Sequence, residues 1–194
     1  IQMLVRSNPS AQYVSDVAAT FVNNGGGVRG DLRAVVTRIL THSEANTTSL
    51  TGDKLMEPAL YIASICRTLN AAVADHPFMT DLSEEMGQKV MYPPSVFSYF
   101  SPGYRIRGTT VNAPEFMGLT SVTALMRNNF VAYLLGNRFG ADVVVDDTPF
   151  TSRAADPAGL TDYISTLFLG GQMSAEHRAE IINRVQVSAP TNLT

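Results

Sequence analysis

The sequence contains one cysteine, no tryptophan and three histidines. A single cysteine cannot form an internal disulfide, so no disulfide framework stabilises the fold. The histidines, His42, His76 and His177, are far apart, and the chain contains no His-x-x-x-His or Cys-x-x-Cys pair. Zinc sites are usually built from such pairs. We therefore expect no metal site and no cofactor.

Charged residues are scarce, at 16% of the 194 residues, and 14 basic and 17 acidic side chains leave a formal net charge of −3. Proteins that bind nucleic acid need clustered cations to neutralise phosphates, and this chain has no run of basic residues. Its apolar runs are far shorter than the ~18 residues that a membrane-spanning helix needs. The composition therefore argues against nucleic acid as a partner and against a membrane span.

Several familiar motifs of catalysis and ligand binding are also missing. No Gly-x-Ser-x-Gly nucleophile elbow occurs, and Cys66 lies in an apolar helical pattern, where a cysteine acts as a small core side chain. The stretch "GGGVRGD" (25–31) lacks the Lys-Ser/Thr of a phosphate-binding loop, so we interpret it as a corner between two helices. The acidic stretch 142–147 lacks the alternating ligands of a calcium loop and is interpreted as a solvated turn.

Most of the chain has apolar residues at helical spacing, with capping residues at the expected ends. The pattern predicts helices over about residues 10–22, 31–40, 58–73, 81–86, 114–135, 156–170 and 174–187. The only strand-like run, residues 143–145, is too short and isolated to build a sheet. Residues 87–113 are rich in proline, glycine and aromatic residues and are interpreted as an ordered loop, whose length favours a functional role.

These patterns predict a mostly α fold, a single-core bundle of six or seven helices with one long ordered aromatic and proline-rich loop. We expect one helical domain over residues 1–187 and a tail over residues 188–194. The chain opens with "IQMLV", which is apolar at nearly every position and resembles a helix already under way. We therefore expect an excerpt of a longer protein, and self-association into a homo-oligomer through exposed apolar surface.

The stretch "MYPPSVFSYFSPGYR" (91–105) holds five aromatic residues and three prolines. Phe97 and Phe100 have the spacing of one helical turn, which predicts that they point inward and plug the core. Tyr99, Tyr104 and Arg105 are expected to line a cleft and bind a ligand, because they combine flat faces with polar tips. The absence of tryptophan weakens the interpretation as a carbohydrate-binding surface, because tryptophan is the strongest stacking partner for a sugar.

Two glutamates, Glu57 and Glu115, each stand beside a proline at the start of a predicted helix. A pair of carboxylates that meet in the fold could act as general acid and base in glycoside hydrolysis. The alternative is structural, because an acid in the first turn of a helix stabilises the helix dipole. In that case Arg29 or Arg105 would be a suitable partner. The sequence leaves both interpretations open.

Several ordered motifs carry a family resemblance: "SNPSAQYVSDVAATFVNNGGGVRGDLRAVVTRIL", "GDKLMEPALYIASICRTL", "PPSVFSYFSPGYR" and "APEF". Together they resemble the bacterial family known as domain of unknown function 1800. Their order and spacing match over about residues 4–130, and the match is looser to residue 187. The resemblance implies that the chain is the C-terminal part of a longer member. It also implies a secreted or cell-envelope location, and it carries no mechanism.

These observations lead to two functional hypotheses. The first is a bacterial envelope or secreted protein that acts as a structural or binding module for a polymer, such as a polysaccharide, or for an envelope protein. The alternative is a hydrolase that acts on a polysaccharide through the Glu57–Glu115 pair. The sequence does not decide whether the protein is an enzyme, and any enzymatic activity is expected to be glycosidase-like.

Overall fold

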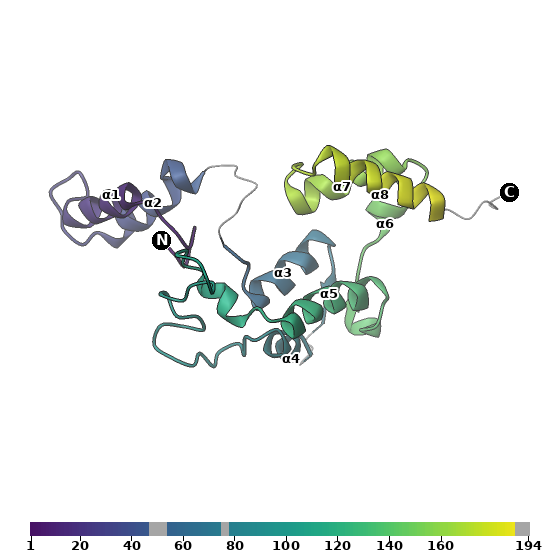
Figure 1. Ribbon diagram of the computed structural model, residues 1–194, viewed down its shortest axis with the longest axis horizontal. Helices are drawn as coiled ribbons and strands as arrows, with labels where there is room; N and C mark the ends of the chain where they lie inside the picture. Colours follow the sequence, from purple (N-terminus) through teal and green to yellow (C-terminus); the bar gives the residue numbers. More distant parts are fainter. Residues whose placement is uncertain (47–53, 75–77, 189–194) are drawn as a thin grey trace. The chain divides into compact units, whose positions relative to one another are not determined.

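The computed structural model describes residues 1–46, 54–74 and 78–188, and these are mostly helical (Figure 1). The predicted fold class is therefore confirmed. The described residues form eight α-helices: α1 (Ala11–Val22), α2 (Leu32–Thr41), α3 (Pro58–Thr68), α4 (Phe78–Glu85), α5 (Ser121–Leu135), α6 (Thr148–Thr151), α7 (Pro157–Leu169) and α8 (Ala175–Ser188). None of these helices is long and apolar enough to cross a membrane.

The remaining regular structure of the described residues is short. Three 3-10 helices, η1 (Ser43–Ala45), η2 (Pro114–Gly118) and η3 (Gly140–Asp142), lie between the α-helices. Two strands, β1 (Ala72–Val73) and β2 (Val143–Val144), pair antiparallel. Helix α6 is a single turn that begins after an acidic pair at Asp146–Asp147 and was not predicted, because four residues are too few to show helical periodicity.

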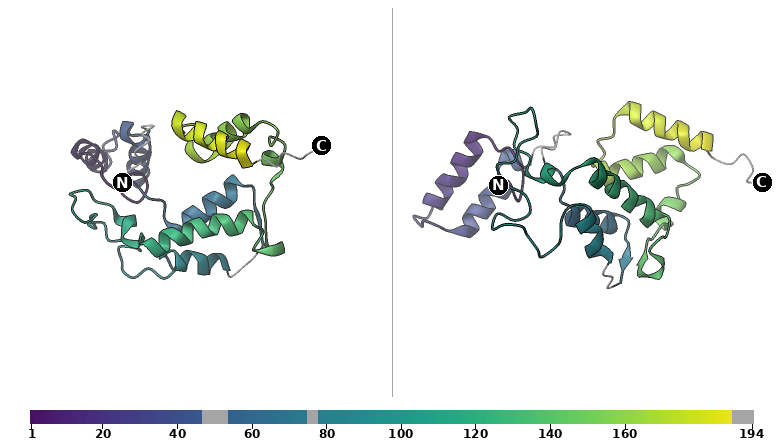
Figure 2. Two further views of the ribbon diagram at one scale, coloured as in Figure 1. Left: turned by 45° about the vertical axis from the view of Figure 1, so that its right-hand side comes forward. Right: turned by 60° about the horizontal axis from the view of Figure 1, so that its bottom comes forward.

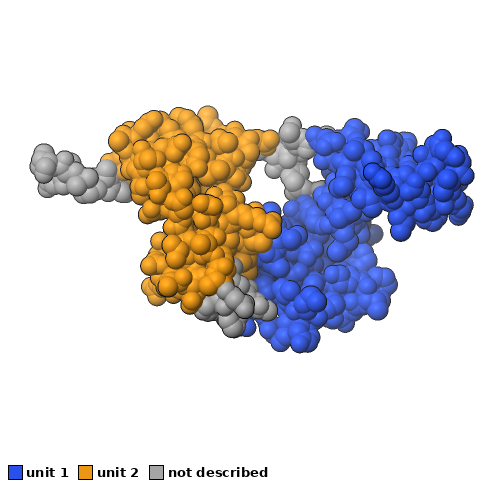
Figure 3. All heavy atoms as spheres, turned by 180° about the vertical axis from the view of Figure 1, so that it is seen from behind, with its two compact units in different colours: residues 1–61, 78–128 blue, residues 62–77, 129–194 orange. Residues whose placement is uncertain are grey.

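The chain divides into two compact units, which have separate colours in Figure 3. Unit 1 comprises Ile1–Tyr61 and Phe78–Asn128, and unit 2 comprises Ile62–Pro77 and Asn129–Thr194. The division falls within α3 and α5, so each of these helices contributes residues to both units. The single domain over residues 1–187 and the tail stay predictions, and residues 189–194 of that tail lie outside the described residues.

Helices α1 and α2 pack side by side as a hairpin in unit 1 (Figure 2). Ser10 caps α1 because its side chain accepts a hydrogen bond from the Tyr13 amide, and Asp31 caps α2 by accepting from the Ala34 amide. These side-chain acceptors satisfy amides that have no partner within the helix. Residues 25–31 form the corner between the two helices, as predicted, and Gly25, Gly27 and Gly30 adopt positive φ angles there, which glycine accepts readily.

The long loop over residues 87–113 is present as predicted, with only isolated bridges inside it. The predicted plug is wrong for Phe97, whose side chain is 66% exposed, while Phe100 is half-buried. Ser98 has a φ of 74°, so the chain turns sharply and no helical turn forms. Helical spacing therefore does not place the two rings on one inward face. Leu82 and Met86 of the preceding segment are buried in the core of unit 1 instead.

The helix predicted over residues 114–135 is interrupted. It forms η2 first and then α5, with Thr120 between them. The Thr120 side chain accepts a hydrogen bond from the Thr123 amide at 3.2 Å, and the Thr123 hydroxyl donates to the Gly118 carbonyl at 2.8 Å. Side-chain hydrogen bonds of this kind compete with the backbone hydrogen bonds of a continuous helix, so η2 ends and a new helix begins. Glu115 consequently belongs to a short, separate turn.

In unit 2, α7 packs on α8. Asp156 caps α7 and Gly170, with a φ of 58°, ends it, as the sequence predicted. Helix α3 ends at Thr68, before the predicted limit of residue 73, because Asn70 adopts a φ of 48° and the chain leaves the helix there. The following strand β1 pairs with β2. The predicted strand at residues 143–145 therefore does form a small sheet, contrary to the expectation from sequence.

Candidate functional site

A pocket of about 350 Å³ in unit 1 is lined by both glutamates of interest. Glu57 stands directly before α3, and Glu115 lies in the first turn of η2. The other lining residues are mostly apolar: Gln2, Met3, Val96, Phe97, Ser98, Phe100, Pro102 and Pro114. An apolar pocket with a few polar groups is the usual form of a small-molecule site. We call it the carboxylate pocket.

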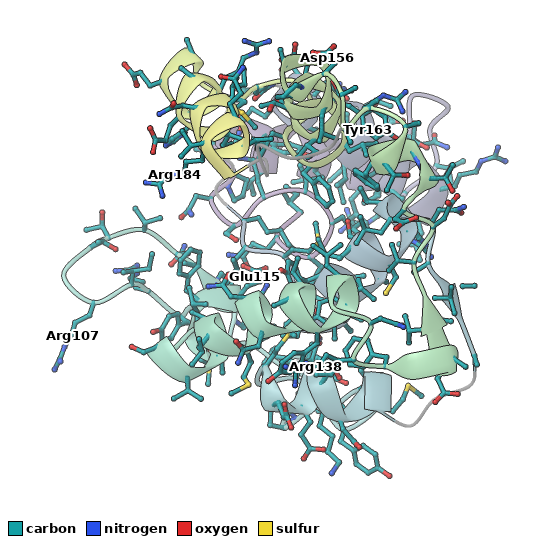
Figure 4. The ribbon with its side chains drawn as sticks, turned by 90° about the vertical axis from the view of Figure 1, so that its right-hand side faces the viewer. Arg107, Glu115, Arg138, Asp156, Tyr163 and Arg184 are labelled. Atoms are coloured by element: carbon teal, nitrogen blue, oxygen red, sulfur yellow. The ribbon has the colours of Figure 1, made fainter. Side chains whose placement is uncertain are left out.

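Glu115, which is labelled in Figure 4, is buried, with 5% of its surface exposed. Its Oε2 accepts a hydrogen bond from the Ser7 hydroxyl at 3.0 Å, and its Oε1 lies 3.1 Å from the Lys54 ammonium nitrogen. Lys54 also donates to the backbone carbonyls of Gln2 and Met3, both at 2.7 Å. A buried carboxylate needs such compensation for its lost hydration. Both oxygens of Glu115 are therefore engaged within the fold.

Glu57 is half-buried and is held by a single amide side chain. The Gln88 Nε2 donates to Glu57 Oε2 at 2.8 Å, and Gln88 Oε1 accepts from the Ala59 amide at 2.8 Å. Gln88 itself is 3% exposed. It thus fixes the orientation of Glu57 and at the same time satisfies an amide in the first turn of α3. Among the described residues, Glu57 Oε1 has no hydrogen-bond partner, so this oxygen can accept one from a ligand.

The prediction that Arg29 or Arg105 pairs with one of the two glutamates is wrong. The Arg29 guanidinium lies over the Phe21 ring at 5.5 Å, and Arg105 Nε donates to Asn112 Oδ1 at 3.3 Å. Lys54 is the cationic partner of Glu115 instead, and Glu57 is held by the neutral Gln88. No local pattern in the sequence identifies this lysine, because it meets Glu115 only through the tertiary fold.

The N-terminal segment forms one side of the carboxylate pocket and is tied to the long loop. Gln2 Nε2 donates to the carbonyl of Pro102 at 3.2 Å. Asn8 and Asn112 are joined by two hydrogen bonds, from Asn8 Nδ2 to the Asn112 carbonyl and from the Asn112 amide to Asn8 Oδ1, at 2.5 and 2.8 Å. These bonds hold the two segments in place before any ligand arrives, which lowers the entropy cost of binding.

The three residues predicted to bind a ligand do not line this pocket. Tyr99 is half-buried and its ring is tilted against that of Phe100, with 6.3 Å between the ring centroids. Tyr104 is half-buried, and its carbonyl accepts from the Ala113 amide at 2.9 Å. Arg105 is exposed. The two phenylalanines of the loop line the pocket in their place, and ligand binding by the tyrosines and Arg105 stays a prediction.

Of the described residues, neither His42 nor His177 nor Cys66 lines the carboxylate pocket. His42 stacks on Tyr13, with 4.0 Å between ring centroids, and His76 lies outside the described residues. Cys66 is 6% exposed, and burial raises the pKa of its thiol above the usual value. In the ranges that the structure describes, no three His, Cys, Asp or Glu side chains converge in a way that could hold a metal ion.

Comparison with known proteins gives one match. A family model described as "Protein of unknown function (DUF1800)" matches residues 1–193. No curated protein and no solved structure matches the chain. The family match covers nearly the whole sequence and confirms the resemblance carried by the Gly-Val-Arg-Gly-Asp-Leu corner and the aromatic loop. This chain belongs to the DUF1800 family.

Proposed function

We propose that this chain is a binding module of a bacterial envelope or secreted protein, and that the carboxylate pocket holds part of a polysaccharide. One observation carries the proposal: an exposed aromatic ring, Phe97, lines the same pocket as two carboxylates. Sugar rings combine apolar faces with hydroxyl groups. An aromatic ring covers such a face, and carboxylate oxygens accept hydrogen bonds from the hydroxyls.

The surroundings of the two glutamates favour binding over catalysis. A general acid or base must exchange a proton with its substrate. Glu115 is engaged by Lys54 and Ser7 on both of its oxygens, so a proton transfer would disrupt contacts that stabilise unit 1. Glu57 has one oxygen without a partner in the described part of the chain and is held in position by Gln88. Glu57 is therefore the acceptor that we assign to the ligand.

The binding proposal is tested with a panel of polysaccharides and peptidoglycan fragments, screened by thermal shift and quantified by calorimetry. We expect Phe97→Ala to weaken binding by about 1–3 kcal/mol, the cost of removing an aromatic anchor. Tyr92→Ala is the matched control, because Tyr92 is 69% exposed on the same loop and does not line the pocket. Equal losses in both variants, or no ligand in the whole panel, would contradict the proposal.

A second candidate function is hydrolysis of a polysaccharide. It is favoured by the fact that Glu57 and Glu115 line one pocket. One of the carboxyl groups would protonate the glycosidic oxygen, and the other would activate water or attack the sugar. Release of reducing ends from polysaccharides measures this activity. Glu57→Gln and Glu115→Gln should each lower the rate by about 10²-fold or more, whereas an inactive wild-type protein excludes this candidate.

The proposal extends to the location and to the other partners. Secretion or residence in the cell envelope is proposed from the family resemblance alone. An envelope protein as partner and self-association through apolar surface also stay predictions. Exposed apolar residues in unit 1 that support self-association include Met3, Leu4 and Leu32, each more than half exposed.

A further inference from the structure

Unit 2 contains a second pocket, of about 470 Å³, whose described lining residues are all aliphatic or phenylalanine side chains. They come from α3 and the residue that follows it, α5, α6 and α7. Leu160, Ile164 and Phe168 form the α7 wall at a spacing of four residues, and Val131 and Phe150 also line the pocket. Its volume falls within the range of small-molecule sites. We call it the apolar pocket.

A cation lies beside the apolar pocket. The Arg153 guanidinium carbon is 4.2 Å from the centroid of the Tyr163 ring, and this ring packs edge-on against Phe150 with 5.6 Å between centroids. Phe150 lines the pocket. Arg153 is exposed, and one of its nitrogens donates to the Pro149 carbonyl at 2.6 Å. The rest of its planar fork remains available for a carboxylate.

Two of the acidic groups near Arg153 in sequence are engaged elsewhere. Asp162 accepts from Arg178 at 2.6 and 2.8 Å, and Asp156 caps α7 by accepting from the Gly159 amide at 3.0 Å. Within the described residues, no carboxylate forms an ion pair with Arg153. A purely apolar pocket thus adjoins a positive charge that has no counter-ion there.

We propose that the apolar pocket binds the acyl chain of a free fatty acid, whose carboxylate pairs with Arg153. Burial of a hydrocarbon chain against apolar walls is favourable by about 25 cal/mol per Å². Arginine and carboxylate form the bidentate pair that fixes such a head group. The acyl chain would also cover Phe168, a lining residue of the pocket that is 40% exposed. This site is independent of the carboxylate pocket.

The test is calorimetric titration of the whole chain with dodecanoate below its micellar concentration. Dodecyltrimethylammonium, which carries the same hydrocarbon with the opposite charge, is the matched ligand. We expect one saturable site for dodecanoate and an affinity at least about tenfold lower for the cation, a difference of about 1.4 kcal/mol. No binding of dodecanoate, or equal affinity for both compounds, would overturn the proposal.

Variants locate the site. Arg153→Gln should weaken dodecanoate binding about tenfold. Arg138→Gln is its control, because Arg138 is also exposed and stacks over a tyrosine, Tyr133, at 5.7 Å. Figure 4 shows Arg138 well separated from Tyr163. Equal effects of the two arginine variants would contradict the assigned head-group contact.

Two further variants fill the apolar pocket. Ile164→Phe and Val131→Phe each add volume to a different wall and should each abolish or strongly weaken binding of dodecanoate. Two separate sites are used so that a folding defect in one variant leaves the other as the test, and circular dichroism checks the helix content of both. If a folded variant with a filled pocket binds dodecanoate as tightly as the wild type, the ligand lies elsewhere and the proposal fails.

Discussion

Lys54 and Glu115 form an ion pair in unit 1, with 3.1 Å between Nζ and Oε1 and only 18% and 4% of the two side chains exposed. The same ammonium group donates to two carbonyls of the N-terminal segment. Lys54, in the segment before α3, therefore joins the N-terminal segment to the first turn of η2. Removing one partner of such a pair leaves a buried charge without compensation.

Lys54→Met keeps most of the length of the side chain but removes its charge. We expect the free energy of unfolding to fall by about 3 kcal/mol, because Glu115 loses its ionic partner in a buried site. Urea denaturation measures this change. The control is Lys89→Met, whose ion pair with Glu84 is half exposed on both sides and should contribute less than about 1 kcal/mol. Similar losses in the two variants would mean that the Lys54–Glu115 pair has no special structural role.

Phe97→Ala should have little effect on stability. Its ring is 66% exposed, so we expect a loss below about 1 kcal/mol, as for most surface substitutions. Phe130→Ala, at a position that is fully buried in unit 2, should cost about 3–5 kcal/mol. Thermal and urea denaturation of both variants provide the comparison. A large loss of unfolding free energy for Phe97→Ala would show that this ring is buried in the core after all.

The α1–α2 hairpin should lose stability in acid. The hydrogen bond from Gln12, together with contacts to Arg38 and His42, lowers the pKa of Asp16 below its usual value. A carboxyl whose pKa is lower in the folded state stabilises the protein above its unfolded pKa of about 3.9. This contribution is lost as the pH falls through the folded pKa.

Asp16→Asn tests this prediction through melting temperatures measured from pH 7 down to pH 2. The wild-type melting temperature should fall more steeply below about pH 4 than that of Asp16→Asn, which has no charge to lose there. Glu85→Gln, at an exposed position in α4, is the control and should retain the wild-type slope. If Asp16→Asn has the same acid slope as the wild type, Asp16 does not stabilise the hairpin through its charge.

Cys66 should react slowly with iodoacetamide in the native protein. It is 6% exposed, and burial raises the pKa of its thiol, so both access and the thiolate fraction are low at pH 8. In urea the reaction should become fast. An exposed cysteine introduced by Ala132→Cys in a Cys66→Ala background gives the reference rate. A native rate close to this reference would show that α3 opens readily around Cys66.

The sequence predicted best those helices whose ends are set by a capping residue next to them in the sequence. Ser10 and Asp156 cap the helices that follow them, and Gly170 ends α7 with the left-handed conformation that glycine accepts. Strand β1 was missed because its partner, β2, lies far later in the chain and the pairing leaves no local pattern. Two-residue strands are also too short for any alternation to be seen.

The candidate site was predicted only in part. The proline-flanked positions of Glu57 and Glu115 indicated two acids of interest, and the fold brings both to one pocket. The sequence did not predict that Phe97 lines the pocket. Helical spacing is informative only where the backbone is helical, and the positive φ of Ser98 turns the chain away from a helix. Lys54 was missed because its contact with Glu115 is a product of tertiary structure.

The central claim is that the carboxylate pocket holds the ligand, and methionine methyl groups report on it directly. Met3 lines this pocket, whereas Met91 is 84% exposed outside it and Met173 belongs to unit 2. The measurement is an NMR titration of methyl-labelled methionine with the polysaccharide fragment that binds best in the panel. We predict a saturable shift of the Met3 methyl resonance and unchanged resonances for Met91 and Met173. A shift at Met91 or Met173 with Met3 unchanged would contradict the claim.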